Sequence, residues 1–405
     1  MKLSRREYHR VHVEGRVAYI RRDRVNGLSE VEAIIFDCDG VLIDTRRSYD
    51  QTIGRTVCFI LDRLVGFSFP RRVITSSIIY TLRGSGGFNS DWDSTYVILL
   101  YLFSRLPKPF LLRFHEARQG VVHPPESTPA LAETLRSLAS ALRGSLPEKW
   151  VRERVKAMRA GLSRFVEQAD HRGVSSLEGR LLADSQPEWR RAAVRSFKAL
   201  LGYPERAGQS LLATVFDEIF YGARLFQRVH RRGAQFYMGA GTIENETVMI
   251  KASTLRQLVA MVGSSNVGIA SGRGSAATEK TLGRLLNYFN PRARVHLEDE
   301  ELLADHHPMQ EAKAKPAPYA LLKSARAMKR FTRALYVGDS AEDVIMARRA
   351  NEVDPRFLFA GVISGAHHQR KRRMFVEANA DVILSSANQL PRILRACQRN
   401  ALSRK

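Results

Sequence analysis

The sequence predicts an α/β fold: a Rossmann-like, doubly wound parallel sheet with a large all-helical domain inserted after its first strand. Four apolar segments have the length and the β-branched content of buried strands. Helical patterns separate the later segments, and such alternation is typical of a parallel sheet. The long stretch between the first two segments shows almost only helical patterns. A split sheet domain with a helical insertion accounts for both observations.

The predicted strands share one feature, which is that small or polar residues follow each of them. The strands cover residues 31–36, 267–270, 334–337 and 357–363, with helical patterns at 276–286 and 341–350. In open sheets of this class, ligands bind beyond the carboxyl ends of the strands. The polar residues that follow these segments are therefore the candidates for a functional site.

The inserted stretch contains helix starts and one strongly apolar run. Thr128 followed by Pro129 predicts an N-cap with proline at the first helical position. Ser145 and Glu148 have the spacing of a capping box. The apolar run 96–103 is far shorter than the roughly 20 residues that cross a bilayer. We therefore expect a buried helix there and no membrane partner.

These patterns predict a division of the chain into four parts. They are a basic N-terminal extension at 1–27, an α/β core at 28–45 and 242–395, a helical cap at 46–241, and a basic C-terminal tail at 396–405. Valines alternate with polar residues around Gly15, which indicates a short hairpin within the extension.

Composition limits the class of protein. The three cysteines among 405 residues have neither the number nor the spacing of a disulfide framework or a zinc site. The basic N-terminus lacks the apolar core of a secretory signal, so we expect a cytoplasmic protein. The net charge of +23 leaves nucleic-acid binding open. Basic residues are spread along the whole chain, which favours an arginine-rich surface that attracts anionic metabolites. The oligomeric state is left open.

Two carboxylates follow the first predicted strand. Asp37 and Asp39 are two residues apart, so on an extended segment they project to the same side. One can attack phosphorus while the other handles the proton of the leaving group. Carboxylates at the end of an apolar strand are costly unless they are paired or bound to a metal. This pair is therefore the first candidate for chemistry.

Three further clusters follow later elements. Ser271-Gly272-Arg273 offers a hydroxyl and backbone N–H groups to phosphate oxygens. Lys315, held by the prolines that follow it, supplies a fixed positive charge. Asp339 and Asp343, around a strand-to-helix turn, are suitable oxygen ligands for Mg²⁺. Each signal is weak alone, but their order predicts a site for phosphoryl transfer.

Taken together, these segments resemble the four motifs of the haloacid dehalogenase superfamily. The matching residues are Asp37-Cys38-Asp39-Gly40-Val41, Ser271-Gly272-Arg273, Lys315-Pro316, and Gly338-Asp339-Ser340 with Asp343. Residues 42–45 and the insertion after them resemble subfamily IA, the branch of phosphoglycolate phosphatase and β-phosphoglucomutase, although this insertion is unusually long. Residues 86–93 and 241–246 resemble a branch found in archaea and cyanobacteria.

The resemblance implies roles in catalysis for four residues. Asp37 would form an aspartyl-phosphate, and Asp39 would protonate the leaving oxygen and then activate water. Ser271 and Lys315 would stabilise the phosphoryl group. The dehalogenases that name the superfamily lack the second aspartate, so dehalogenation is disfavoured.

The resemblance also implies a Mg²⁺ site. Asp37, the carbonyl of Asp39, and Asp339 would bind the ion, with Asp343 in support.

The expected substrate is a small phosphorylated metabolite. We expect substrate contacts from Gly272, Arg273, Arg46 and Asn89, although Asn89 or Ser90 is equally suited to be a helix N-cap. Residues 241–246 are expected to be the hinge of a closing cap, with acidic residues in solvent. A phosphomutase remains an alternative because a large cap can hold a bisphosphate intermediate. A nucleic-acid end-processing or binding protein is the lesser alternative.

Overall fold

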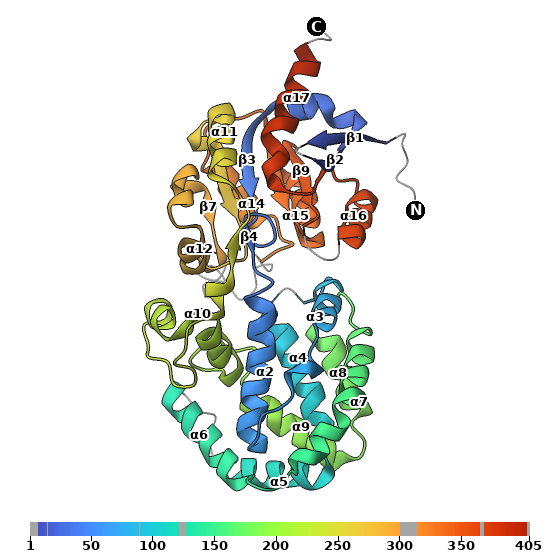
Figure 1. Ribbon diagram of the computed structural model, residues 1–405, viewed down its shortest axis with the longest axis vertical. Coiled ribbons are helices and arrows are strands. Elements are labelled where there is room, and N and C mark those ends of the chain that lie inside the picture. Colours follow the sequence, from blue (N-terminus) through green and yellow to red (C-terminus); the bar gives the residue numbers. More distant parts are fainter. Residues whose placement is uncertain are drawn as a thin grey trace. The chain divides into compact units, whose positions relative to one another are not determined.

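The structure is a computed structural model, and it describes residues 7–13, 15–88, 90–120, 127–299, 314–364 and 368–402. The chain divides into two compact units (Figure 1). One consists of Met1–Thr45 with Glu246–Lys405, and the other is Arg46–Asn245. We call them the sheet unit and the helical unit.

The sheet unit is built on an eight-stranded sheet with the order β1-β2-β10-β9-β8-β3-β6-β7. Its strands are β1 (Tyr8–Val13), β2 (Arg16–Arg21), β3 (Val31–Phe36), β6 (Val267–Ala270), β7 (Arg294–Val295), β8 (Arg333–Gly338), β9 (Phe357–Val362) and β10 (Val382–Leu384). Neighbours from β10 to β7 are parallel. The predicted parallel α/β sheet is thus confirmed, and all four predicted strands are present.

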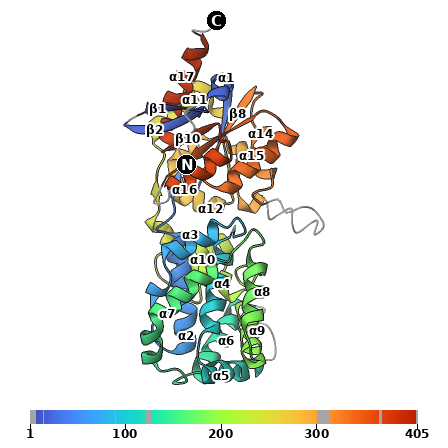
Figure 2. The same cartoon turned by 90° about the vertical axis from the view of Figure 1, so that its right-hand side faces the viewer.

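Helices pack on both faces of this sheet, as expected for strands that are apolar on both sides. One face is covered by α1 (Val25–Ser29), α11 (Ala252–Val262) and α17 (Leu390–Leu402). The other face is covered by α14 (Tyr319–Arg326), α15 (Ala341–Val353) and α16 (His368–Glu377), and Figure 2 shows α14 and α15 side by side. Each face has its own buried apolar cluster. The doubly wound arrangement follows from these two clusters.

Residues 8–13 and 16–21 belong to the sheet, so within the described residues the prediction of a separate extension at 1–27 is wrong. The hairpin predicted from the alternating valines is confirmed as β1 and β2. Strand β2 also pairs with β10, and the Tyr8 hydroxyl donates to the Ala380 carbonyl at 2.8 Å. Pairing with β2 covers the edge that β10 would otherwise leave open.

Residues 396–402 belong to a core helix, so the predicted tail at 396–405 is wrong for these residues, and 403–405 lie outside the described residues. Helix α17 runs without a break from Leu390 to Leu402. Leu390, Ile393, Leu394 and Cys397 have the spacing of one apolar helix face, and all four are buried in the same cluster. The arginines between them hid this face in the sequence.

The helical unit contains nine α-helices among its described residues. They are α2 (Tyr49–Val65), α3 (Ser76–Arg83), α4 (Asp91–Ser104), α5 (Lys108–Gln119), α6 (Thr128–Ala141), α7 (Glu148–Val166), α8 (Val174–Asp184), α9 (Glu188–Leu201) and α10 (Leu211–His230). Helix α4 is buried all round from Ser94 to Ser104, which confirms the buried helix predicted at 96–103. Within the part of the chain that is described, none of the helices could span a membrane.

Both helix starts predicted in this unit differ in detail. Ser127, not Thr128, caps α6 by accepting from the Ala130 N–H at 3.5 Å. The capping box of Ser145 and Glu148 does not form. Helix α7 begins at Glu148 after a proline, and the Ser145 hydroxyl donates to the Leu142 carbonyl at 2.5 Å instead. Local motifs therefore located the helices but not their caps.

Candidate functional site

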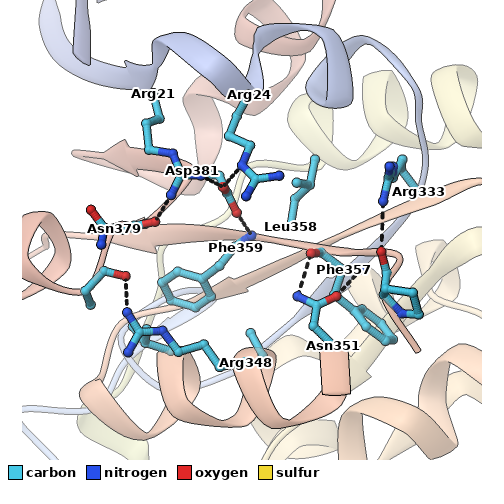
Figure 3. Close-up of a pocket in the computed structure, with 15 residues that line it drawn as sticks. Arg21, Arg24, Arg333, Arg348, Asn351, Phe357, Leu358, Phe359, Asn379 and Asp381 are labelled. Atoms are coloured by element: carbon cyan, nitrogen blue, oxygen red, sulfur yellow. Dashed lines mark hydrogen bonds and ion pairs between the residues drawn. The ribbon is translucent and has the colours of Figure 1, made fainter. Parts of the chain in front are cut away.

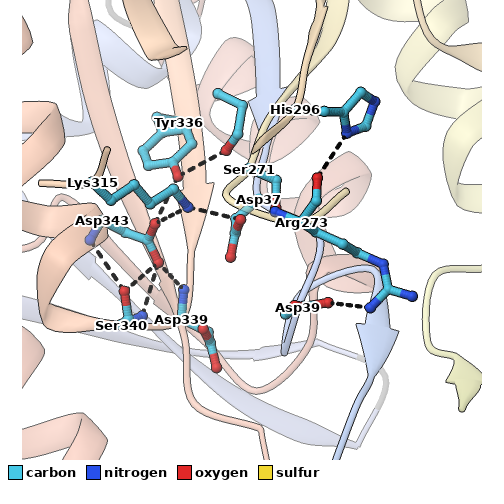
Figure 4. Close-up of polar contacts among 11 residues, drawn as sticks. Asp37, Asp39, Ser271, Arg273, His296, Lys315, Tyr336, Asp339, Ser340 and Asp343 are labelled. Atoms are coloured by element: carbon cyan, nitrogen blue, oxygen red, sulfur yellow. Dashed lines mark hydrogen bonds and ion pairs between the residues drawn. The ribbon is translucent and has the colours of Figure 1, made fainter. Parts of the chain in front are cut away.

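Polar side chains from three neighbouring strands meet at the carboxyl edge of the sheet (Figure 4). Asp37 follows β3, Ser271 follows β6, and Asp339 follows β8. Asp37 N–H donates to the Val337 carbonyl at 2.9 Å, and Ser271 N–H donates to the Val295 carbonyl at 3.1 Å. These bonds continue the sheet by one residue and fix where the two side chains start.

Lys315 bridges two buried carboxylates. Its Nζ donates to Asp37 Oδ1 and to Asp343 Oδ1, both at 2.7 Å. Burial alone would lower the pKa of Lys315, but the carboxylates of Asp343 and Asp37 raise it well above the ordinary value. Lys315 therefore stays protonated, and a fixed positive charge lies beside the predicted nucleophile.

Asp343 is held in place by the start of α15. It forms a capping box with Ser340, and its Oδ2 also accepts from the Asp339 N–H at 2.9 Å. Its Oδ1 accepts from the Tyr336 hydroxyl at 2.7 Å. Burial would raise the pKa of Asp343, but Lys315 and these hydrogen bonds hold it below the ordinary value. Asp343 is thus an ionised carboxylate with both oxygens engaged.

Three carboxylates form a possible cation site. Asp37, Asp339 and Asp343 each present an oxygen within 4.8 Å of the others. Such an oxygen-only donor set fits a hard cation such as Mg²⁺. Burial raises the pKa of Asp37, Lys315 opposes that rise, and the neighbouring carboxylates add to it. A bound cation would favour the ionised form. Asp37 and Asp339 are the better ligands, because the oxygens of Asp343 already accept several hydrogen bonds.

Two residues that the sequence did not single out as site residues define the position of Asp339. Gly40 has φ +74°, and a Cβ atom there would clash with the Asp339 carboxylate. Lys371 of α16 pairs with Asp339 Oδ2 through its Nζ. Lys371 lies in the basic run 370–373, where nothing local distinguishes it from its neighbours. Its partner is only evident once α16 is placed on the sheet.

Asp39 points away from this cluster, toward Arg273 (Figure 4). Its Oδ1 accepts from Arg273 Nη1 at 3.0 Å. Burial raises the pKa of Asp39 to about 6, although Arg273 opposes the rise. The side chain keeps 34% of its exposure, so it remains accessible. Its carboxylate is not part of the cation site, which leaves only its carbonyl as the predicted ligand.

Arg273 does not have the environment expected for a substrate contact. Its side chain is fully buried, and its Nη2 donates to Glu246 Oε2 at 2.6 Å. The predicted substrate contact stays a prediction, because in this structure Arg273 bridges Asp39 and Glu246. Glu246 was missed as a site residue, because the acidic residues of 241–246 were assigned to solvent. Its side chain is fully buried and also accepts from the Thr281 hydroxyl at 2.6 Å.

The other predicted substrate residues are Gly272, Arg46 and Asn89. A side chain at Gly272 would meet open space, so a ligand has room there. Arg46 is the first residue of the helical unit, and its substrate contact stays a prediction. Asn89 lies outside the described residues. Ser90 accepts from the Trp92 N–H at 3.1 Å and serves as the N-cap of α4.

Comparison with known proteins adds two similarities. The family model of the haloacid dehalogenase-like hydrolases matches residues 31–351. An X-ray structure from the Northeast Structural Genomics Consortium has a TM-score of 0.63 and 19% identity, and the match covers 93% of this chain and 100% of that one. At this identity, the likeness concerns the fold alone. A search of curated proteins found no match.

Proposed function

Because the chain belongs to the haloacid dehalogenase-like hydrolases, we propose that it is a Mg²⁺-dependent phosphatase acting on a small phosphorylated metabolite. The observation that carries this proposal is the pairing of Asp37 with Lys315 at 2.7 Å, beside the carboxylates of Asp339 and Asp343. A nucleophile, a fixed cation and an oxygen-rich metal site are the groups that phosphoryl transfer needs.

Within the family, we assign the chain to subfamily IA and the helical unit to the role of cap. The insertion lies directly after the turn that follows β3. The two chain segments that lead into and out of it, β4 (Ile43–Asp44) and β5 (Thr247–Val248), pair as antiparallel strands. Such a paired stem suits a hinge, since it holds both links at one place. We place this enzyme in the cytoplasm.

In the first half of the proposed reaction, a carboxylate oxygen of Asp37 attacks phosphorus and the ester P–O bond breaks. Asp39 gives its proton to the leaving oxygen, for which a pKa of about 6 is suitable. The Ser271 hydroxyl binds a phosphoryl oxygen, and Lys315 offsets the negative charge on the transferring group. The product of this half is an aspartyl-phosphate at Asp37 and a free alcohol.

In the second half, Asp39 takes a proton from water, and the resulting hydroxide attacks phosphorus. The bond between Asp37 and phosphorus breaks, inorganic phosphate leaves, and both aspartates return to their starting states. Asp37 and Asp339 would hold Mg²⁺ with Asp343 in support. When bound, the ion supplies charge stabilisation for the phosphoryl oxygens.

Phosphate release from a panel of phosphorylated metabolites tests the proposal. We expect release of inorganic phosphate with Mg²⁺, loss of turnover in EDTA, and recovery when Mg²⁺ is added in excess. A phosphomutase would return the phosphate to another hydroxyl, so an isomeric sugar phosphate without inorganic phosphate would favour that alternative. Full activity in EDTA would contradict the metal role of Asp339.

Replacement of Lys371 by methionine is expected to tighten Mg²⁺ binding. The Lys371 ammonium pairs with Asp339, and both side chains are mostly buried at 19% and 18% exposure. A cation must displace it, and a pair worth about 1 kcal/mol corresponds to a roughly fivefold lower Kd in the variant. Calorimetric titration with Mg²⁺ measures this change.

The matched control is Arg373→Met, which removes one positive charge from an exposed position on the same helix. We expect this variant to change the Kd for Mg²⁺ by less than about twofold, because exposed charges are screened. If both variants bound Mg²⁺ more tightly by the same factor, the change in net charge, and not the loss of the Lys371–Asp339 pair, would explain the effect. Weaker binding in Lys371→Met would contradict the competition.

A further inference from the structure

A cavity of about 340 Å³ lies in the sheet unit (Figure 3). Its lining includes the starts of two strands, at the edge of the sheet opposite to the catalytic carboxylates. Arg333 and Phe357, which begin β8 and β9, contribute to its lining. Asp339 follows the other end of β8. At about 3.3 Å per residue, the six residues of this strand separate the two edges by roughly 17 Å. The cavity is therefore distinct from the proposed active site.

The lining of this cavity is strongly cationic. In the described part of the chain, four arginines line it, Arg21, Arg24, Arg333 and Arg348, and Asp381 is the one acidic lining residue. Arg24 Nε lies 3.2 Å from Asp381 Oδ1, and Arg21 Nη2 lies 3.7 Å from the same oxygen. Arg21 also pairs with Asp23 at 2.7 Å. Arg24 Nε lies 3.7 Å from Asp23 Oδ2, so Arg21 and Arg24 share two carboxylates, Asp23 and Asp381.

The other two arginines bind mainly to backbone carbonyls. Arg348 Nη2 donates to the Ala378 carbonyl at 2.6 Å, and Arg333 Nη1 donates to the Pro355 carbonyl at 2.8 Å. Among the residues described, Arg348 has no carboxylate at ion-pair distance, and Arg333 has only the exposed Glu30 at 3.7 Å. A hydrogen bond to a backbone carbonyl orients a guanidinium group but does not compensate its positive charge. The cavity therefore favours an anion with several acceptor oxygens.

One wall of the cavity is apolar. Val344 and Ala347 of α15 line it, together with Pro355 and Phe357. A bare phosphate ion would need only the arginines. The volume falls in the range of small-molecule pockets, which is roughly 300–1,000 Å³. The combination suits an anionic group that carries a flat or apolar body.

We propose that this cavity binds a nucleoside monophosphate or a phosphate monoester of similar size. Arg24, Arg333 and Arg348 supply the positive charge that attracts the phosphate, and Val344, Ala347 and Phe357 contact the body of the ligand. The proposal does not depend on the proposed phosphatase activity, because none of these residues has a catalytic or metal-binding role in it, although Val344 follows Asp343 in α15.

Calorimetric titration with adenosine 5′-monophosphate tests the proposal. The protein is the full chain with Asp37→Asn, in EDTA, so that the probe is not turned over and metal-dependent binding at Asp339 is suppressed. We expect a submillimolar Kd. Adding Arg24→Gln and Arg348→Gln together should raise the Kd at least tenfold. Arg24→Gln alone, at a half-exposed position, should raise it about threefold.

The matched control adds Arg292→Gln and Arg326→Gln instead, which removes the same charge from exposed positions of the same unit. It should keep the Kd within twofold, and thermal unfolding checks that each variant is folded. Equal weakening in both double variants would overturn the proposal, as would the absence of binding. If inorganic phosphate bound with the same Kd as adenosine 5′-monophosphate, the proposal that the ligand is a phosphate ester would be overturned.

Discussion

Asp37→Asn should abolish phosphate release, with a loss of at least about 10⁴-fold in kcat. The asparagine amide has nearly the size of the carboxylate but cannot form an aspartyl-phosphate. Neither Lys315 nor Asp39 can replace it, because the first is a cation and the second points toward Arg273. Initial rates of phosphate release, and acid-quench detection of the phosphoenzyme, measure the loss.

The same variant should fold at least as well as the parent protein in EDTA. Burial raises the pKa of Asp37 above that of the unfolded chain, so the folded state binds its proton more tightly. Stability then falls as the pH rises from the unfolded pKa of 3.8 through the folded one. Asparagine removes this penalty at neutral pH, although it weakens the bond from Lys315.

A thermal transition at or above that of the parent protein would therefore accompany the lost activity. A large fall in Tm would attribute the loss to misfolding. Turnover above about 1% of the parent rate, with an intact fold, would contradict the role of Asp37 as nucleophile. Asp37→Ala, which leaves a gap beside Lys315, is the harsher comparison and should be less stable than Asp37→Asn.

The catalytic edge was predictable because its signals are local. An apolar run such as residues 31–36 identifies a strand without reference to the rest of the chain, and parallel order then brings Asp37, Ser271 and Asp339 to one edge. Lys315 could be assigned because the proline that follows it marks a turn. For these residues, the sheet order was enough to predict proximity.

The residues that were missed depend on contacts between distant segments. Glu246 and Arg273 are 27 residues apart, and each has charged or polar neighbours that resemble a solvated surface. Helix α17 shows the same difficulty, because arginines lie between Leu390, Ile393, Leu394 and Cys397, which are all buried. A segment rich in charged residues is expected to be exposed from its composition. Which of its faces is buried depends on tertiary packing, which the composition does not show.

Arg273→Met should lower the free energy of unfolding by about 3–5 kcal/mol. The Arg273 guanidinium is fully buried and compensates the carboxylates of Asp39 and Glu246. Methionine fills part of the space but removes the ion pair between the buried Glu246 carboxylate and Arg273. Calorimetry is the suitable measurement, because the three tryptophans, Trp92, Trp150 and Trp189, all lie in the helical unit and do not report on the sheet.

A second substitution separates lost charge compensation from lost packing. The double variant Arg273→Met with Glu246→Gln also removes the buried negative charge that Arg273 compensated, so much of the stability should return. Arg292→Met, at an exposed position, should change stability by less than about 0.5 kcal/mol. If the double variant were as unstable as the single one, packing and not charge would explain the loss.

Kinetics of the folded Arg273→Met fraction then decide what the arginine does. Because Arg273 contacts Asp39 and is closed to solvent, its loss should lower kcat by misplacing the acid–base group, with little change in KM. Arg273→Lys keeps the positive charge but cannot hydrogen-bond to both carboxylates as the guanidinium does. It should therefore retain more of the stability of the parent protein than of its activity. A raised KM with unchanged kcat would instead support the direct contact between Arg273 and the substrate that the sequence predicts.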